Sequence, residues 1–137
     1  MFGGGDGARL HGDAGTDFLD GGSGNDRLYG VSGDDVLKGW TGRDYFDGGS
    51  GIDTVVFSGS GYSESQKVVN LDAGYAFSPD SRTFETIRNV ENVVLSRGDD
   101  SAIGTSGANV LDGAAGNDRL AGLGGNDKLI GGTGDDR

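Results

Sequence analysis

The sequence predicts an all-β fold: a parallel β-roll, or right-handed β-solenoid, made of two blocks of nonapeptide units with an intervening β insert. Three observations predict it. Glycine recurs every nine residues, aspartate follows two residues after it, and a large apolar residue follows two residues after the aspartate. Because this pattern holds in register over many units, it indicates a stacked repeat architecture.

The units define two blocks. The first set begins at Gly3, Gly12, Gly21, Gly30, Gly39 and Gly48, and the second at Leu95, Gly104, Gly113, Gly122 and Gly131. The fourth position is glycine in every unit but the first: Gly15, Gly24, Gly33, Gly42, Gly51, Gly98, Gly107, Gly116, Gly125 and Gly134. The sixth is Asp17, Asp26, Asp35, Asp44, Asp53, Asp100, Asp118, Asp127 and Asp136, with Ala8 and Asn109 as exceptions. The eighth is Leu10, Leu19, Leu28, Leu37, Phe46, Val55, Leu111, Leu120 and Leu129, with Ala102 as the exception.

Each unit divides into a turn and a short strand. The first six residues are glycine-rich and end in the aspartate, and the last three alternate outward, inward and outward. Two units, or eighteen residues, therefore make one coil with two strands, and successive coils stack about 4.8 Å apart. The eighth residues of both strands are expected to point inward and form a narrow core.

The chain is expected to divide into a first β-roll block at residues 3–56, an intervening β segment at 57–94, and a second block at 95–137. The interval between the blocks is not a whole number of units, so the register shifts across it. Strand-like stretches at 68–71 and 90–95 and turn material at 58–65 and 78–81 predict a short insert that continues the stack or covers its side. The last unit stops before its apolar residue, which suggests a piece of a longer protein.

Composition excludes several classes of protein. The chain has 137 residues, of which 30 are glycine, none is cysteine, and few are large and apolar. Disulfides and thiolate metal sites are therefore absent, and the thin core needs another stabilising device. The net charge of −11 disfavours nucleic acid as a partner. No apolar run could span a membrane, and the first twenty residues lack an N-terminal signal pattern.

The recurring aspartates predict cation binding. Alternate units lie on the same side of the stack, so their carboxylates form columns and repel by roughly 3 kcal/mol per pair at an effective dielectric of 20. A divalent ion between two neighbouring carboxylates would replace this repulsion with a net attraction. Carboxylate and carbonyl oxygens suit Ca²⁺, which takes six to eight oxygens, better than zinc, copper or magnesium.

These residues resemble the RTX, or haemolysin-type, calcium-binding repeat with the pattern G-G-x-G-x-D-x-U-x, in which U is large and apolar. The resemblance covers residues 3–56 and 95–137 and implies that each ion lies between successive turns on one side. It implies that the calcium ligands are the backbone carbonyls at positions two and four and the aspartate of the earlier turn, together with the carbonyls at positions one and three and the aspartate of the later turn.

The resemblance implies six sites. In the first block Asp13, Gly15 and Asp17 would meet Gly30, Ser32 and Asp35; Gly22, Gly24 and Asp26 would meet Gly39, Thr41 and Asp44; and Val31, Gly33 and Asp35 would meet Gly48, Ser50 and Asp53. In the second, Ser96, Gly98 and Asp100 would meet Gly113, Ala115 and Asp118; Thr105, Gly107 and Asn109 would meet Gly122, Gly124 and Asp127; and Ala114, Gly116 and Asp118 would meet Gly131, Thr133 and Asp136.

Three departures qualify this expectation. Ala8 removes a carboxylate from the first unit, Asn109 offers a neutral oxygen, and Leu95 replaces a glycine where the second block begins, which suits an end cap. Roughly six ions remain, and their charge would nearly neutralise the chain.

The resemblance also implies calcium-coupled folding of a non-catalytic module within a larger secreted protein, exported by bacterial type I secretion with a C-terminal signal. Other domains of that protein would be partners. The parent's activity cannot be named from these repeats.

Two alternatives stay open. Glu64, Glu85 and Glu91 in the insert could form an acid pair for catalysis, but solvated surface carboxylates are the favoured interpretation, and His11 lies at an outward position, where an ordinary exposed histidine is expected. The outer face of the first block carries Arg9, His11, Arg27, Tyr29, Tyr45 and Asp47, which could bind an anionic polysaccharide. The other sheet shows Phe18, Val36 and Val56 outward, and Trp40 lies in a turn, where packing on a neighbouring turn is expected.

Overall fold

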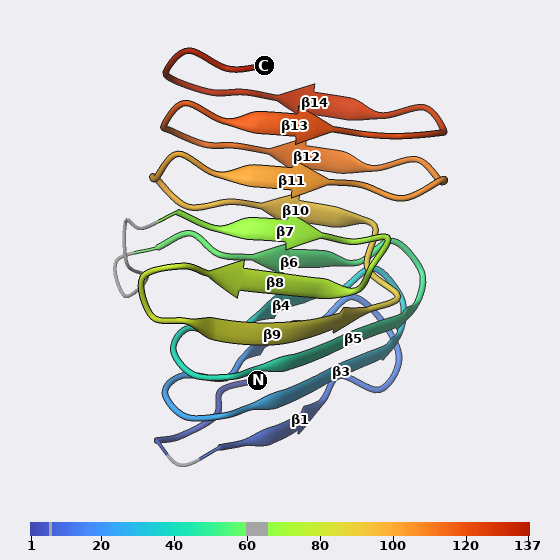
Figure 1. The fold of residues 1–137 in the computed structure, drawn as a ribbon. Coiled ribbons are helices and arrows are strands. Elements are labelled where there is room, and N and C mark those ends of the chain that lie inside the picture. The colour runs from blue at the N-terminus through green and yellow to red at the C-terminus, as the bar shows by residue number, and fades with distance from the viewer. Residues whose placement is uncertain (6, 60–65) are drawn as a thin grey trace.

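The computed structural model describes residues 1–5, 7–59 and 66–137, and within them the chain forms two β-sheets and no helix (Figure 1). The eight-stranded sheet has the order β1 (Arg9–His11), β3 (Arg27–Ser32), β5 (Tyr45–Ser50), β9 (Thr83–Arg88), β8 (Tyr75–Ser78), β7 (Val68–Asn70), β11 (Ser101–Ile103), β13 (Arg119–Ala121). The six-stranded sheet has the order β2 (Phe18–Asp20), β4 (Val36–Lys38), β6 (Thr54–Val56), β10 (Asn92–Val94), β12 (Val110–Asp112), β14 (Lys128–Ile130).

The coil of eighteen residues is confirmed by the strand register. In the eight-stranded sheet Leu10 pairs with Leu28 and Leu28 with Phe46, and both strand pairs are parallel. In the six-stranded sheet Leu19 pairs with Leu37 in the same parallel manner. Each coil therefore places one strand in each sheet, as the two-unit repeat predicts.

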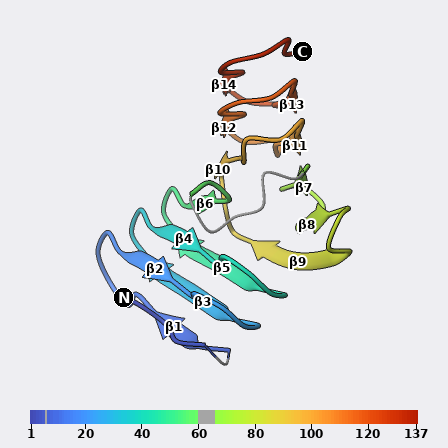
Figure 2. The same ribbon diagram turned by 90° about the vertical axis from the view of Figure 1, so that its left-hand side faces the viewer.

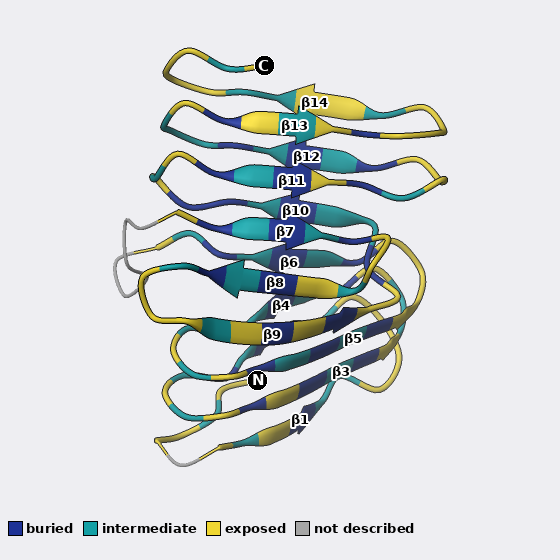
Figure 3. Ribbon diagram, viewed as in Figure 1, coloured by how far each residue is buried: buried dark blue, intermediate teal, exposed yellow. Residues whose placement is uncertain are grey.

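The core is a narrow strip between the sheets. The eighth-position residues Leu19, Leu28, Leu37, Phe46, Val55 and Leu111 are fully buried. Figure 3 shows this strip as the dark centre of successive strands, flanked by paler positions. Leu129, expected to be buried, is 48% exposed, because β14 is the edge strand of its sheet.

The insert continues the stack instead of covering its side. After β6 the chain crosses to β7, which pairs with β11, and then returns through β8 to β9, which pairs with β5. Among the described strands only β8 is antiparallel to its neighbours. The expected strands at 68–71 and 90–95 correspond to β7 and β10, whereas β8 and β9 were not foreseen. Of the expected turn at 58–65, residues 60–65 lie outside the described part.

The insert also bends the stack. Between β5 and β11 it places three strands in one sheet, but between β6 and β12 it places only β10 in the other. Two additional strands lengthen one face by about 10 Å at ordinary strand spacing. Figure 2 shows the result, with the two blocks inclined to each other.

Candidate metal sites between the turns

The sixth-position aspartates form hydrogen-bonded columns along both sides of the stack. One carboxylate oxygen, Oδ1, accepts the backbone N–H of the sixth residue one coil earlier. The bond runs from Asp17 to Asp35 at 2.8 Å and from Asp35 to Asp53 at 2.9 Å. The same bond joins Asp26 to Asp44, Asp100 to Asp118, Asn109 to Asp127 and Asp118 to Asp136. The backbone therefore holds each carboxylate in one orientation, facing the neighbouring coil.

The second carboxylate oxygen is the strongest indication of a cation. Oδ2 is buried and has no hydrogen-bond partner in Asp26, Asp35, Asp44, Asp53 and Asp118. These side chains are between 0% and 3% exposed. Leaving a buried carboxylate oxygen unpartnered is costly, since neither water nor a donor replaces its lost solvation. A cation between the coils would supply the partner that the protein does not.

Backbone carbonyls point into the same gaps. A Cβ added to Gly33 would collide with the Gly15 carbonyl oxygen, and one added to Gly30 would lie 2.5 Å from the Gly48 carbonyl oxygen. The Asp13 carbonyl accepts the Ser32 N–H at 3.1 Å, and the Ser32 carbonyl accepts the Gly15 N–H at 2.9 Å. The backbone carbonyls at positions one to four of the unit are thus directed across the gap, where the resemblance places calcium ligands.

The other gaps follow this geometry, with differences in the second block, where the Gly98 N–H donates to Ser96 Oγ and the Gly107 N–H donates to Thr105 Oγ1. Hydrogen bonds from an N–H to a carbonyl across the gap join Gly22 with Thr41, Gly24 with Thr41, Gly33 with Ser50, Thr105 with Gly124, Ala114 with Thr133 and Gly116 with Thr133. Carbonyls that a Cβ added to the later glycine would meet occur for Gly24 with Gly42, Val31 with Gly49, Gly33 with Gly51, Gly107 with Gly125, Gly98 with Gly116, Ala114 with Gly132 and Gly116 with Gly134. At the start of the second block, the Ala115 N–H bonds to the Gly113 carbonyl at 3.0 Å.

Two aspartate-column residues in that region are already engaged. Asp100 Oδ2 accepts the Ser96 N–H and Oγ–H, both at 2.8 Å. Asn109 Oδ1 accepts the Thr105 N–H at 2.7 Å and its hydroxyl at 3.2 Å. These oxygens have partners without a cation, so the geometry favours ions less strongly at these two predicted sites than at the gaps with unpartnered oxygens.

Sequence reasoning missed residues that the insert adds to the columns. Glu91 precedes β10 and accepts the Asp53 N–H at Oε2, 2.9 Å away. Glu91 lies eighteen residues before Asn109, so the repeat spacing could have found it. On the other side Lys67 precedes β7, and its N–H donates to Asp100 Oδ1 at 2.6 Å. No spacing signal pointed to Lys67.

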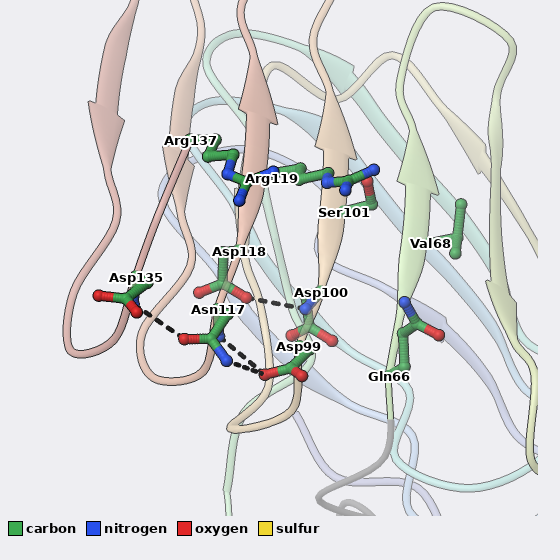
Figure 4. A pocket seen from close by; sticks show the side chains of 10 residues that line it. All are labelled: Gln66, Val68, Asp99, Asp100, Ser101, Asn117, Asp118, Arg119, Asp135 and Arg137. Carbon is green, nitrogen blue, oxygen red and sulfur yellow. Dashed lines mark hydrogen bonds between the residues drawn. The ribbon is translucent and has the colours of Figure 1, made fainter.

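A second, outer ladder was also missed. The Asn117 N–H donates to Asp99 Oδ1 at 2.8 Å, and the Asp135 N–H donates to Asn117 Oδ1 at 2.9 Å. Figure 4 shows this ladder beside the inner bond from Asp100 to Asp118, with Arg119 and Arg137 farther along the strands. Fifth-position side chains therefore tie the turns together outside the candidate metal gaps.

Burial raises carboxylate pKa values in the columns. The pKa of Asp44 rises to about 7, mainly through desolvation, with Glu85 and Asp26 adding repulsion. Desolvation also raises the pKa of Asp53 to about 6 and raises the pKa values of Asp100 and Asp118. The metal-free fold thus resists the charged form of these groups, which is the opposite of what a bound cation would do.

The acid pair considered for catalysis is not assembled by the described residues. Glu85 lies within β9 of the eight-stranded sheet and bonds to Lys67 at 3.2 Å, whereas Glu91 precedes β10 in the six-stranded sheet. The two carboxylates therefore belong to columns on different sides. Glu64 lies outside the described residues.

Other predicted surface features are placed as follows. The outward face of β1, β3 and β5 aligns Arg9, Arg27 and Tyr45 in one row and His11, Tyr29 and Asp47 in the next. Trp40 contacts the Lys38 ammonium, 3.8 Å from the ring centroid. Phe18 is 45% exposed and contacts Phe2.

No three carboxylate or imidazole side chains gather as a metal cluster within residues 1–5, 7–59 and 66–137. A site here would combine two carboxylates with backbone carbonyls, which are hard oxygen donors suited to calcium. The fold and these gaps define a β-roll whose stacked turns can hold divalent cations. In the part of the chain that the structure describes, no helix is long and apolar enough to cross a membrane.

The repeat pattern of the RTX calcium-binding nonapeptide family matches the chain in four copies, at residues 2–37, 21–55, 95–129 and 103–137. These copies cover most of the chain, which belongs to this family. Repeats of this family bind calcium and are typical of secreted bacterial proteins. No curated protein matches the sequence.

Proposed function

We propose that the chain is a non-catalytic module of a larger secreted protein and that it folds when calcium binds between its turns. About six ions would use the six predicted ligand sets. The observation that carries this proposal is the row of buried, unpartnered aspartate oxygens. Metal binding to a site that exists only in the folded chain contributes directly to folding.

Charge supports the same proposal. The chain carries a net charge of −11, and the carboxylates of each column recur once per coil. At ten times its Kd each ion would add about 1.4 kcal/mol of stability. Extracellular calcium modules bind at about 10⁻⁴–10⁻³ M, so such a chain would stay loose at low cytosolic calcium and fold outside the cell.

A calcium titration followed by circular dichroism tests the proposal. The metal-free chain should show a coil spectrum at neutral pH and a β spectrum as calcium rises, whereas magnesium should be far less effective. An Asp35→Asn/Asp53→Asn variant should need more calcium, because it loses two column carboxylates. A chain equally folded in excess EGTA would overturn the coupling.

A second candidate function is binding of an anionic polysaccharide on the outer face of the first block. His11 stacks on Tyr29 with ring centroids 4.8 Å apart, and the Arg9 guanidinium lies 5.2 Å from the Tyr29 ring. Aromatic rings beside exposed arginines suit an anionic sugar chain, although Asp47 lies in the same row and would repel it.

Retention on an alginate column tests this second candidate. The calcium-loaded chain should be retained, and an Arg9→Ala/Arg27→Ala variant should elute earlier. Arg119→Ala/Arg137→Ala is the matched control, because it removes two exposed arginines from the second block. Equal elution of both variants would indicate non-specific charge effects, and absence of retention would exclude the candidate.

A further inference from the structure

One column of sixth-position residues continues through the insert. Glu91 precedes β10 as Asp53 precedes β6, and these two strands pair in parallel register. The Asp53 N–H donates to the Glu91 carboxylate at 2.9 Å, as the Asp35 N–H donates to the Asp53 carboxylate at 2.9 Å. Glu91 therefore occupies the place of a repeat aspartate although it lies in a segment without the repeat pattern.

A backbone carbonyl completes the resemblance to a repeat gap. A Cβ added to Gly48 would collide with both the Asn89 carbonyl oxygen and Asp53 Oδ2. The equivalent point at Gly30 is bordered by the Gly48 carbonyl oxygen and Asp35 Oδ2. The Asn89 carbonyl thus stands where the first-position carbonyl of a later turn stands.

The carboxylate facing this gap needs a partner. Asp53 is 0% exposed, its Oδ1 is used by the Asp35 N–H, and its Oδ2 has no hydrogen-bond partner. The gap therefore combines two carboxylates, one of them fully buried, with a carbonyl directed at the same point. Gly49 and Gly51 hold the second and fourth positions of the earlier turn, whose carbonyls face the later turn elsewhere in the column.

On the opposite side of the junction, a buried carboxylate of the column is paired with a lysine. There the Lys67 ammonium donates to Ser78 Oγ and to Glu85 Oε1, the latter at 3.2 Å. The Lys67 and Glu85 side chains are only 8% and 4% exposed. The insert thus supplies its own buried cation to one column and an additional carboxylate to the other.

We propose that the junction between the two blocks holds one further calcium ion, bound by Asp53, Glu91 and the Asn89 carbonyl, and that Lys67 takes the place of an ion on the opposite side. The proposal rests on the proposed function, because it assumes that the repeat gaps bind calcium. Its consequence is that calcium, besides stabilising the stacked turns of each block, also joins the first block to the insert.

Ion counting by native mass spectrometry tests the junction site. At saturating calcium, Glu91→Gln should bind one ion fewer than the parent chain, because the amide keeps the hydrogen-bond acceptor but loses the charge. Asp34→Asn is the matched control. The Asp34 carboxylate also accepts a backbone N–H one coil away, from Ile52 at 2.8 Å, but it lies outside the gaps. Its ion count should equal that of the parent.

The outcomes separate the two proposals. A parent chain that binds no ions contradicts the proposed function itself, whereas equal counts for the parent and Glu91→Gln overturn only the junction site. If Glu91→Gln gives no β spectrum at saturating calcium, the junction site is tested instead in crystals of the parent chain grown with calcium. Long-wavelength anomalous diffraction then locates the bound calcium ions. A peak between Asp53 and Asn89 supports the junction site, and peaks confined to the repeat gaps refute it.

Discussion

At the residue scale, several second-position residues adopt a left-handed backbone that favours glycine. Val31 has φ of 81°, Trp40 of 70° and Leu123 of 73°. A positive φ is unfavourable for any side chain with a Cβ and most so for a β-branched one. Non-glycine residues in this region cost about 1–3 kcal/mol each. The sequence at these places therefore carries strain that the stacked turns must offset.

Replacing Val31 by glycine should stabilise the calcium-loaded fold by about 1 kcal/mol, because relief of backbone strain exceeds the added freedom of the unfolded chain. The side chain is 45% exposed, so little burial is lost. Urea unfolding at saturating calcium measures the change. Gly49→Ala, at the same position one coil later with φ of 103°, should destabilise, since its Cβ would collide with the Val31 carbonyl. A less stable Val31→Gly would contradict this account.

Two fourth-position glycines separate backbone strain from crowding. Gly15 and Gly33 have nearly equal φ, 116° and 117°, but a Cβ has open space at Gly15 and meets the Gly15 carbonyl at Gly33. Gly33→Ala should therefore lose at least about 1 kcal/mol more stability than Gly15→Ala, because overpacking adds to strain. Urea unfolding at saturating calcium compares them, and equal losses would show that close stacking is not the constraint.

At the element scale, the insert joins two blocks that are out of register. It adds β7, β8 and β9 to one sheet and β10 alone to the other, which bends the stack. Its interior is apolar, with Phe57, Val69 and Ile87 at most 2% exposed. The buried ion pair of Lys67 and Glu85 lies in the same region. Apolar packing and an internal cation thus perform within the insert what calcium is proposed to perform within the blocks.

Breaking this ion pair should be costly. Lys67→Met leaves the Glu85 carboxylate buried without its counter-ion, and Oε2 of Glu85 already lacks a partner. Loss of one member of a buried pair costs about 3–5 kcal/mol, whereas replacing both by apolar residues is often neutral. Lys67→Met should therefore unfold at lower urea than Lys67→Met/Glu85→Leu. The opposite order, measured at saturating calcium, would show that the pair does not act as a unit.

At the scale of the whole molecule, the acidic charge and the narrow core oppose each other. The chain carries 22 acidic residues and a narrow core that lies beside the buried aspartates, so the metal-free fold must bury charge to bury its apolar residues. Protons and calcium are the two cations that can relieve this conflict, and they compete for the same oxygens.

Acid should therefore partly replace calcium. The folded-state pKa of Asp44 is about 7 and that of Asp53 about 6, both raised from an ordinary 3.8. The folded chain then binds more protons than the unfolded chain between about pH 7 and pH 4, so its stability rises as pH falls through that range. In calcium-free buffer, circular dichroism should show more β structure at pH 5 than at pH 7.5.

The control for this pH dependence is Asp44→Asn/Asp53→Asn, in which two of the responsible groups are neutral at both pH values. Its metal-free spectrum should change less between pH 7.5 and pH 5 than that of the parent. In the parent, the calcium concentration needed to fold half of the chains should decrease as pH falls from 7.5 to 5, because protonation already stabilises the metal-free fold. An identical spectral change in the parent and the variant would mean that other groups are responsible.

Repeat spacing by itself determined most of the two blocks. A period of nine with an inward eighth residue specifies coils of eighteen residues, because a strand alternates its side chains and a glycine-rich turn reverses the chain. Pairing of Leu10 with Leu28 and of Leu19 with Leu37 follows directly. The sixth-position columns follow from the same period, including the buried Asp35 and its neighbours.

Only the tertiary structure decided the insert and the ends. The order in which β7, β8 and β9 join the sheet depends on long-range strand pairing, which no local pattern specifies, and that order brings Lys67 to Glu85 and Glu91 to Asp53. The exposure of Leu129 likewise depends on the position of β14 at the edge of its sheet. Local spacing encodes contacts that repeat, whereas contacts made once are set by which distant segments pack together.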